Sequence, residues 1–387
     1  MSRVVYLDNN ATTMVAPEVF EAMKPFLSGR YGNPSSFHSF GGGVRRDIDR
    51  AREQAAQLLN ADPGEIVFTG CGTESDNAAL LGALELAGPA KRHLVITRVE
   101  HEAVLQVGHY LKDKGYRVTE LPVDRSGALD LDQLLDSIAD DTAVVSVMWA
   151  NNETGVLYPV RQIAEAVKSK GVFFHTDAVQ AGGKIPVDLN EVPADFLSLS
   201  GHKFHASKGV GVLFVRRGIK LPPYVRGGHQ ENGMRAGTEN VAGIVGLGVA
   251  AELALKTMTE DYRREGRLRD KLEKGILESC SNVYVNGENR LANTLNVSFE
   301  FIESEAILLM LNDLGICTSS GSACTSGNLE PSHVLRAMGI PNMLAYGSIR
   351  FSLSRYNTEE EIDYVLENLP PIIDRLREIS PFAQRIS

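Results

Sequence analysis

The sequence predicts an α/β protein with a largely parallel sheet that helices cover on both faces, followed by a smaller α+β domain. The first observation is a set of short runs that are apolar along their whole length, as in strands buried on both faces. These runs span 65–69, 94–97, 143–149, 172–176, 196–199 and 210–215. The second observation is helical spacing between the runs, as in 160–168, where apolar residues fall at i, i+3, i+4 and i+7.

The pattern of the sequence changes after about residue 260. A long charged helix is expected at 261–277, a strand at 293–299 and a helix at 305–311. Strands no longer alternate regularly with helices there, so this part is predicted to form the second domain.

Composition excludes several classes of function. The 387 residues hold 39 Lys and Arg against 49 Asp and Glu, a net charge of −10, so the chain lacks the positive surplus of a general nucleic-acid binder. The longest uncharged apolar run, 241–251, is far shorter than the roughly 20 residues of a membrane span, and a packed helix is expected there instead. The N-terminus shows no apolar signal segment, which favours the cytoplasm. The four cysteines include no C-x-x-C pair, which indicates free thiols.

Polar residues follow two of the predicted strands, where a parallel sheet binds its ligands. Asp177 and Gln180 follow the strand at 172–176, and Lys203 follows the one at 196–199. A strand-end salt bridge explains an acid and a lysine there, and a metal site with the nearby histidines explains them less well, because the spacing matches no compact ligand motif. A third interpretation is a site for pyridoxal phosphate. That cofactor needs a lysine for a Schiff base, a carboxylate beside its pyridine nitrogen and an anchor for its phosphate.

A phosphate anchor is predicted after the strand at 65–69. Gly72, Thr73 and Ser75 lie between that strand and an apolar, helix-like segment, so backbone N–H groups and hydroxyls could hold an anion. The alternative is an ordinary glycine turn in which Thr73 or Ser75 caps the helix.

Four further segments carry candidate groups, and the first three of them have a plainer alternative. His101 could lie over a cofactor ring or simply cap a helix, and the glycine-rich stretch that holds Thr238 could bind phosphate or be a plain flexible loop. Arg350 could clamp a carboxylate or form a surface salt bridge. Cys324 lies among small residues, where a thiol is exposed and available as a nucleophile.

Together these segments resemble the NifS/IscS-type cysteine desulfurases, in the class V branch of the fold-type I pyridoxal-phosphate enzymes. The resemblance covers nearly the whole chain and is most like the NifS type, which serves nitrogenase cluster assembly. The matching motifs are YLDNNATT at 6–13, MWANNETG at 148–155, SLSGHK at 198–203, SSGSACTSG at 319–327 and RYNTEEEID at 355–363. The chain departs from the family at Ser207, where proline is usual, and at Tyr346, where histidine is common.

The resemblance implies a mostly parallel seven-stranded sheet in a large domain that binds pyridoxal 5′-phosphate. It divides the chain into an N-terminal segment 1–16 that packs with the small domain, a large domain 17–260, and a small domain 261–387 that carries the catalytic cysteine loop.

The resemblance also implies a role for each site residue. Lys203 would form the Schiff base and move the Cα proton, Cys324 would be the nucleophile, and His101 would stack on the ring. The cofactor would further be bound by Gly72, Thr73, Asn152, Asp177, Gln180, Ser200 and His202, and by Thr238 from the other subunit of a homodimer. The substrate carboxylate would be bound by Asn33, Asn152 and Arg350. No metal site is expected.

The implied activity is removal of sulfur from L-cysteine, which gives L-alanine and a persulfide on Cys324. The sulfur would pass to an iron–sulfur scaffold protein, NifU-like or IscU-like, and Cys324 would transiently contact a cluster there. A selenocysteine lyase and a class V aminotransferase are the nearest alternatives, and a scaffold or sulfur-relay protein that has lost catalysis is a more distant one. No nucleic acid and no membrane partner is expected.

Overall fold

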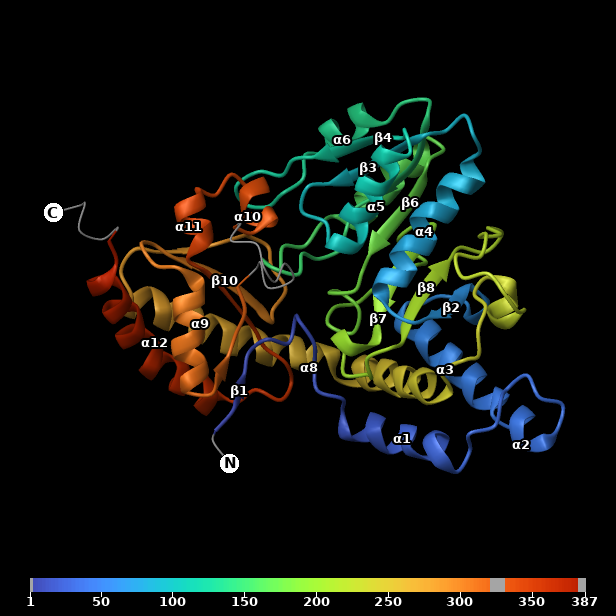
Figure 1. Cartoon of the computed structure of the whole chain (residues 1–387), viewed down its shortest axis with the longest axis horizontal. Helices are drawn as coiled ribbons and strands as arrows, with labels where there is room; N and C mark the ends of the chain where they lie inside the picture. The colour runs from blue at the N-terminus through green and yellow to red at the C-terminus, as the bar shows by residue number, and fades with distance from the viewer. Residues whose placement is uncertain (1–2, 321–330, 382–387) are drawn as a thin grey trace.

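A computed structural model describes residues 3–320 and 331–381. Its centre is a seven-stranded sheet of order β2-β8-β7-β6-β5-β3-β4 (Figure 1). The strands are β2 (Ile66–Thr69), β3 (His93–Thr97), β4 (Arg117–Leu121), β5 (Thr142–Ser146), β6 (Phe173–Asp177), β7 (Phe196–Ser200) and β8 (Gly211–Val215). Only β8 is antiparallel to its neighbours, so the largely parallel sheet is confirmed. Strand β4 escaped prediction because it is a partly exposed edge strand with charged residues.

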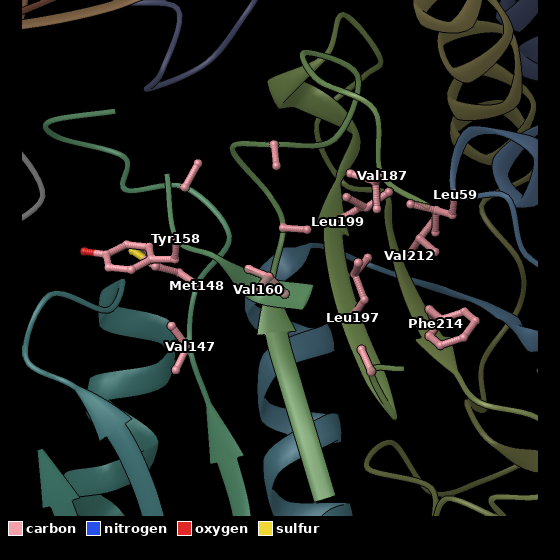
Figure 2. Close-up of a cluster of buried hydrophobic side chains, with 14 of the residues drawn as sticks. Leu59, Val147, Met148, Tyr158, Val160, Val187, Leu197, Leu199, Val212 and Phe214 are labelled. Carbon is pink, nitrogen blue, oxygen red and sulfur yellow. The ribbon is translucent and has the colours of Figure 1, made fainter. Parts of the chain in front are cut away.

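The strands of this sheet are apolar throughout because each face has its own buried cluster. Leu94 and Ile96 of β3 belong to one cluster, whereas Val95 between them belongs to the other. Figure 2 shows the second cluster, where Leu197 and Phe214 project from β7 and β8 on the same face of the sheet. Side chains alternate between the faces of a strand, so burial on both faces requires apolar residues at successive positions.

Helices cover both faces of the sheet, and the segments between the predicted strands form them as expected. Before the first strand of this sheet come α1 (Pro17–Ser28), α2 (Ser39–Gly42) and α3 (Arg45–Leu58), and between its strands lie α4 (Gly72–Ala87), α5 (Glu102–Asp113), α6 (Leu131–Ser137) and α7 (Val160–Ser169). Short 3₁₀ turns η1 (Pro63–Glu65), η2 (Gly201–Lys203) and η3 (Gln230–Gly233) lie in the connections.

A second, smaller sheet has its own buried core. It has the order β12-β10-β9, and its strands are antiparallel: β9 (Val283–Val285), β10 (Thr294–Phe299) and β12 (Ser348–Ser352). Around it lie α9 (Ser304–Asp313), α10 (His333–Ala337), α11 (Asn342–Tyr346) and α12 (Glu359–Ile379). The N-terminal β1 (Val5–Tyr6) pairs with β11 (Ile316–Cys317), and Val5 and Leu7 belong to this second core.

Helix α8 (Val241–Ser279) connects the two parts and runs along both of them (Figure 1). Separate helices at 241–251 and 261–277 were predicted, and this was wrong. The residues between them contain no proline or glycine that would end a helix, so the two segments are continuous. By length and composition α8 could cross a membrane, but 56% of its most apolar window is buried in protein. The proposed domain boundary at residue 260 lies within this helix and stays a prediction.

Candidate active site

A cavity of about 170 Å³ lies at the carboxyl ends of the parallel strands. The residues that line it follow β5, β6 and β7 or lie at the starts of α4 and α5. Nine predicted site residues are brought together here: Gly72, Thr73, His101, Asn152, Asp177, Gln180, Ser200, His202 and Lys203. The remaining wall is formed by Cys71, Asp76, Met148, Ala150 and Val179.

The start of helix α4 forms a cradle that only glycine leaves open. A Cβ atom on Gly72 would lie 2.8 Å from Cγ2 of Val179 and 3.3 Å from Cβ of Ser200. The exposed Thr73 follows it at the cavity, and the first N–H groups of a 16-residue helix have no partner within the helix. This end of the cavity therefore suits an anion.

The predictions for the cap and for Ser75 were wrong. The Cys71 sulfur occupies the cap position and accepts a hydrogen bond from the Glu74 N–H at 3.4 Å. Ser75 is fully buried, and its hydroxyl lies 2.8 Å from that of Thr69, so it is bonded inside the protein rather than facing the cavity.

Asp177 lies at the end of β6 and forms a buried part of the cavity wall. Its Oδ1 accepts a hydrogen bond from the Val179 N–H at 2.8 Å, and the side chain is almost wholly buried. Burial raises the pKa of Asp177 to about 7, and the nearby Asp76 carboxyl adds to the rise. Oδ1 of Asp76 also lies buried at this wall without a hydrogen-bond partner among the described residues. A cationic group in the cavity would stabilise this acidic wall.

His101 both caps a helix and lines the cavity. Its Nδ1 accepts a hydrogen bond from the Ala103 N–H at 3.1 Å, at the start of α5. Burial is the largest cause that lowers the pKa of His101, so the ring is neutral and carries its proton on Nε2. The two sequence-based interpretations of this residue are therefore compatible.

Lys203, in η2, contacts the N-terminal segment. Its Nζ donates hydrogen bonds to the carbonyl oxygens of Asn10 at 2.5 Å and Ala11 at 3.0 Å. The neighbouring His202 bonds through Nδ1 to the Thr12 hydroxyl at 3.1 Å, and burial lowers the pKa of His202 to about 4. These contacts hold residues 10–12 of the N-terminal segment against the cavity-lining Lys203 and His202.

Arg350 lies on β12 of the smaller sheet and reaches the cavity through Asn152. Its guanidinium donates to the Asn152 carbonyl oxygen at 2.9 Å and to Oδ1 of Asp8 at 2.8 Å. The buried Nε has no hydrogen-bond partner among the described residues. A surface salt bridge was the alternative interpretation, but only 5% of Arg350 is exposed.

Cys324 lies outside the described residues. The described ends of its segment lie beside predicted site residues. Ser319 exchanges backbone hydrogen bonds with Arg350, and Nε2 of His333 lies 3.0 Å from the carbonyl oxygen of Glu100, next to His101.

Asn33 and Thr238 do not line the cavity of this chain. Asn33 is exposed near α2, where its Oδ1 accepts a hydrogen bond from the Ser35 N–H at 2.9 Å. Thr238 is exposed in the loop between η3 and α8. The expected role of Thr238 requires a second subunit, so both assignments stay predictions.

The described residues group no three His, Cys, Asp or Glu side chains that could hold a metal ion. Ring nitrogens of His175 lie 2.8 Å from the Ser146 hydroxyl and 3.0 Å from that of Ser198, and Nδ1 of His205 lies 2.9 Å from the Met14 carbonyl oxygen. These histidines are therefore engaged within the protein.

Four residues at the site escaped sequence analysis: Asp8, Asn10, Asp76 and Lys184. The polar segment at 6–13 was a signal for the first two. Asp76 lies on helix α4 and Lys184 in the turns after β6, where a charged residue usually faces solvent, and no local pattern distinguishes them.

Comparison with known proteins identifies the family. The model of the aminotransferase class-V family matches residues 5–365. A cysteine desulfurase of Trichormus azollae is 58% identical over 98% of this chain and 95% of its own length. The cysteine desulfurase NifS of Azotobacter vinelandii is 56% identical, over 98% of this chain and 94% of its own. A solved NifS-like protein superposes with a TM-score of 0.91 at 40% identity, over 97% of this chain and 100% of that one, which confirms the expected fold class. The chain therefore belongs to the class-V aminotransferases and, within them, to the cysteine desulfurases.

Proposed function

We propose that this protein is a pyridoxal-phosphate-dependent cysteine desulfurase that converts L-cysteine to L-alanine and holds the sulfur as a persulfide on Cys324. One observation carries the proposal. A glycine cradle at a helix start, a buried carboxyl and a lysine line a single cavity, through Gly72, Asp177 and Lys203.

The cavity residues fit the cofactor. The N-terminus of α4 at Gly72 and Thr73 suits its phosphate, with Ser200 and His202 close by. The acidic wall at Asp177 suits a protonated ring nitrogen, because an added positive charge would lower the raised pKa of that carboxyl. Bound pyridoxal phosphate supplies the electron sink that makes the Cα proton acidic and the substrate sulfur electrophilic.

The chain's own residues supply the remaining chemistry. Arg350 and Asn152 bind the substrate carboxylate, Lys203 removes and returns the proton at Cα, and neutral His101 carries a proton on Nε2 that it can donate. The thiolate of Cys324 attacks the substrate sulfur. The new S–S bond forms as the C–S bond breaks, and the electron pair of that bond stays on the carbon that becomes the methyl group of alanine.

We further propose the biological setting that the NifS type implies. The enzyme is a homodimer in which each subunit provides Thr238 to the phosphate site of the other. It acts in the cytoplasm and passes its sulfur to an iron–sulfur scaffold protein, in support of nitrogenase maturation. The support for this setting is the identity to NifS of Azotobacter vinelandii together with the exposed position of Thr238.

The test measures alanine and sulfide from L-cysteine, with a reductant present, for the wild type and for Cys324→Ala while the visible spectrum is recorded. A yellow protein that loses desulfuration in the variant supports the proposal. A yellow protein whose variant keeps its amino-acid chemistry unchanged would instead be a lyase of the selenocysteine type or an aminotransferase. A colourless protein that binds no cofactor would overturn the proposal and favour a non-catalytic scaffold.

A further inference from the structure

A half-buried lysine, Lys184, lies next to the cavity and contacts Gln180. Nζ of Lys184 donates a hydrogen bond to Oε1 of Gln180 at 2.7 Å and a longer one to Oδ1 of Asn10 at 3.4 Å. On the other side of the same amide, Nε2 of Gln180 donates to the Asn10 carbonyl oxygen at 3.0 Å. That carbonyl oxygen also accepts the hydrogen bond from Lys203. Lys184 does not line the cavity, so it contacts the site only through other side chains.

This contact decides which way the Gln180 amide faces. The oxygen and nitrogen of an amide have nearly the same size, so packing alone does not distinguish its two orientations. An ammonium group is a donor without acceptor capacity, so it can pair only with the oxygen. The amide nitrogen therefore faces the other side. One of its two N–H groups donates to the Asn10 carbonyl oxygen, and the second is available to the cavity that Gln180 lines.

Charged and titratable side chains from several elements surround Lys184. Lys184 lines a small polar cavity together with charged and titratable residues from three other parts of the chain. These are Glu265 and Asp261 of α8, Arg355 after β12, and His205 and Lys203 from the η2 region. Asp261 forms an ion pair with Arg355, and Arg350 adds positive charge nearby. Burial lowers the pKa of Lys184 to about 7, while burial raises that of Glu265 to about 8. The lysine is therefore held there against the preference of its ammonium group for water.

We propose that Lys184 is a positioning residue that fixes the Gln180 amide with its N–H toward the cofactor, whose phenolic oxygen is the partner that the family resemblance implies for Gln180. The inference rests on the proposed function, since it requires that pyridoxal phosphate be bound. A donor at that oxygen withdraws negative charge from it, which makes the neighbouring linkage to Lys203 easier to deprotonate. Loss of the donor therefore moves the pH midpoint of that deprotonation upward.

The test is a pH titration of the visible absorption of the cofactor-loaded enzyme, without substrate. Lys184→Met removes the donor and keeps the length of the side chain, so its midpoint should rise by about 1 pH unit. Lys184→Gln is the matched control, because its amide can still donate to Oε1 of Gln180 without a charge, and its midpoint should stay near that of the wild type. In a Gln180→Ala background, neither substitution at 184 should move the midpoint further.

The outcomes separate this inference from its alternatives. An unchanged midpoint in Lys184→Met, with only a lower melting temperature, would mean that Lys184 is merely structural. Equal shifts in both 184 variants, persisting in the Gln180→Ala background, would mean that the charge acts directly, and the positioning role would be wrong. Should Lys184→Met not fold, Lys184→Gln in the two backgrounds still decides between charge and orientation. A wild type without a visible band would refute the proposed function itself.

Discussion

The cofactor end of the cavity and its substrate end are built in different ways. Gly72, Asp177 and Lys203 all lie at or just after strands of one sheet, so a single hydrogen-bonded framework sets their spacing. Arg350 comes instead from the smaller sheet and is held by Asp8 of the N-terminal segment. The cofactor end is thus formed by the fold of one sheet, whereas the substrate end depends on how two sheets and the N-terminal segment meet.

This difference also governs the electrostatics of the two ends. At the cofactor end burial raises the pKa of both Asp177 and Asp76 to about 7, while Lys203 donates to the carbonyl oxygens of Asn10 and Ala11. At the substrate end the guanidinium of Arg350 already has a carboxylate partner 2.8 Å away. Under the proposed function, cofactor binding would add a positive charge beside these two carboxyls, whereas the substrate carboxylate would compete with Asp8 for Arg350.

The largest effect is expected at the cofactor end. Lys203→Ala should lower alanine formation from L-cysteine by about 1000-fold, the size expected when a proton-transferring residue is removed. Lys208→Ala, five residues further along the same loop, is a suitable control and should keep nearly full activity. Activity of Lys203→Ala within about 10-fold of the wild type would show that another group moves the Cα proton.

The second effect isolates the substrate end. Arg350→Lys keeps the charge but loses the planar fork, so KM for L-cysteine should rise by about 10- to 100-fold. Asp8→Asn should have the opposite sign, with KM lowered by about 3-fold, because it removes the competing charge and keeps an acceptor for Arg350. Steady-state kinetics with both variants tests the pair. A higher KM in Asp8→Asn would mean that Asp8 serves to orient Arg350 rather than to compete with substrate.

A smaller effect is expected at the phosphate cradle. Gly72→Ala places a methyl group 2.8 Å from Val179, so cofactor affinity should fall by about 10-fold, a change of about 1.4 kcal/mol. Titration of the cofactor-free protein with pyridoxal phosphate measures this. Gly266→Ala in α8 is the matched control, since its added Cβ would meet only Ala292 at 3.7 Å. Equal affinities in the two variants would place the phosphate elsewhere.

The same division explains what could be predicted from the sequence. Residues after strands follow from the rule for parallel sheets, so the positions of Asp177 and Lys203 were predictable from local runs. The pairing of Asp8 with Arg350 joins residues 342 positions apart, and no local spacing encodes such a contact. Lys184 illustrates a third case. It lies in a turn-rich stretch where a lysine usually faces water, and its place beside Glu265 of α8 depends on contacts between distant parts of the chain.

The smallest effect concerns the pH dependence of stability in the cofactor-free protein. Asp177 has a pKa of about 7 when folded and an ordinary carboxyl value when unfolded, so the folded state binds the extra proton between these values. Its contribution to stability is therefore greatest in acid and declines as the pH rises toward 7. Buried neutral histidines such as His175 and His202 change stability in the opposite direction over part of this range, because their pKa values are lowered.

Comparison with Asp177→Asn cancels the histidine contributions, because both proteins contain them. From about pH 5 to about pH 7, the stability of the wild type relative to Asp177→Asn should fall by an amount on the order of 1 kcal/mol, measured by thermal unfolding. In the cofactor-loaded proteins the fall should disappear, because a positive ring nitrogen keeps Asp177 ionised throughout this range. A relative stability that rises with pH in the cofactor-free protein would mean that Asp177 is already ionised there. The acidic wall would then have a cationic partner from the chain itself, and the contrast between the two ends of the cavity would be lost.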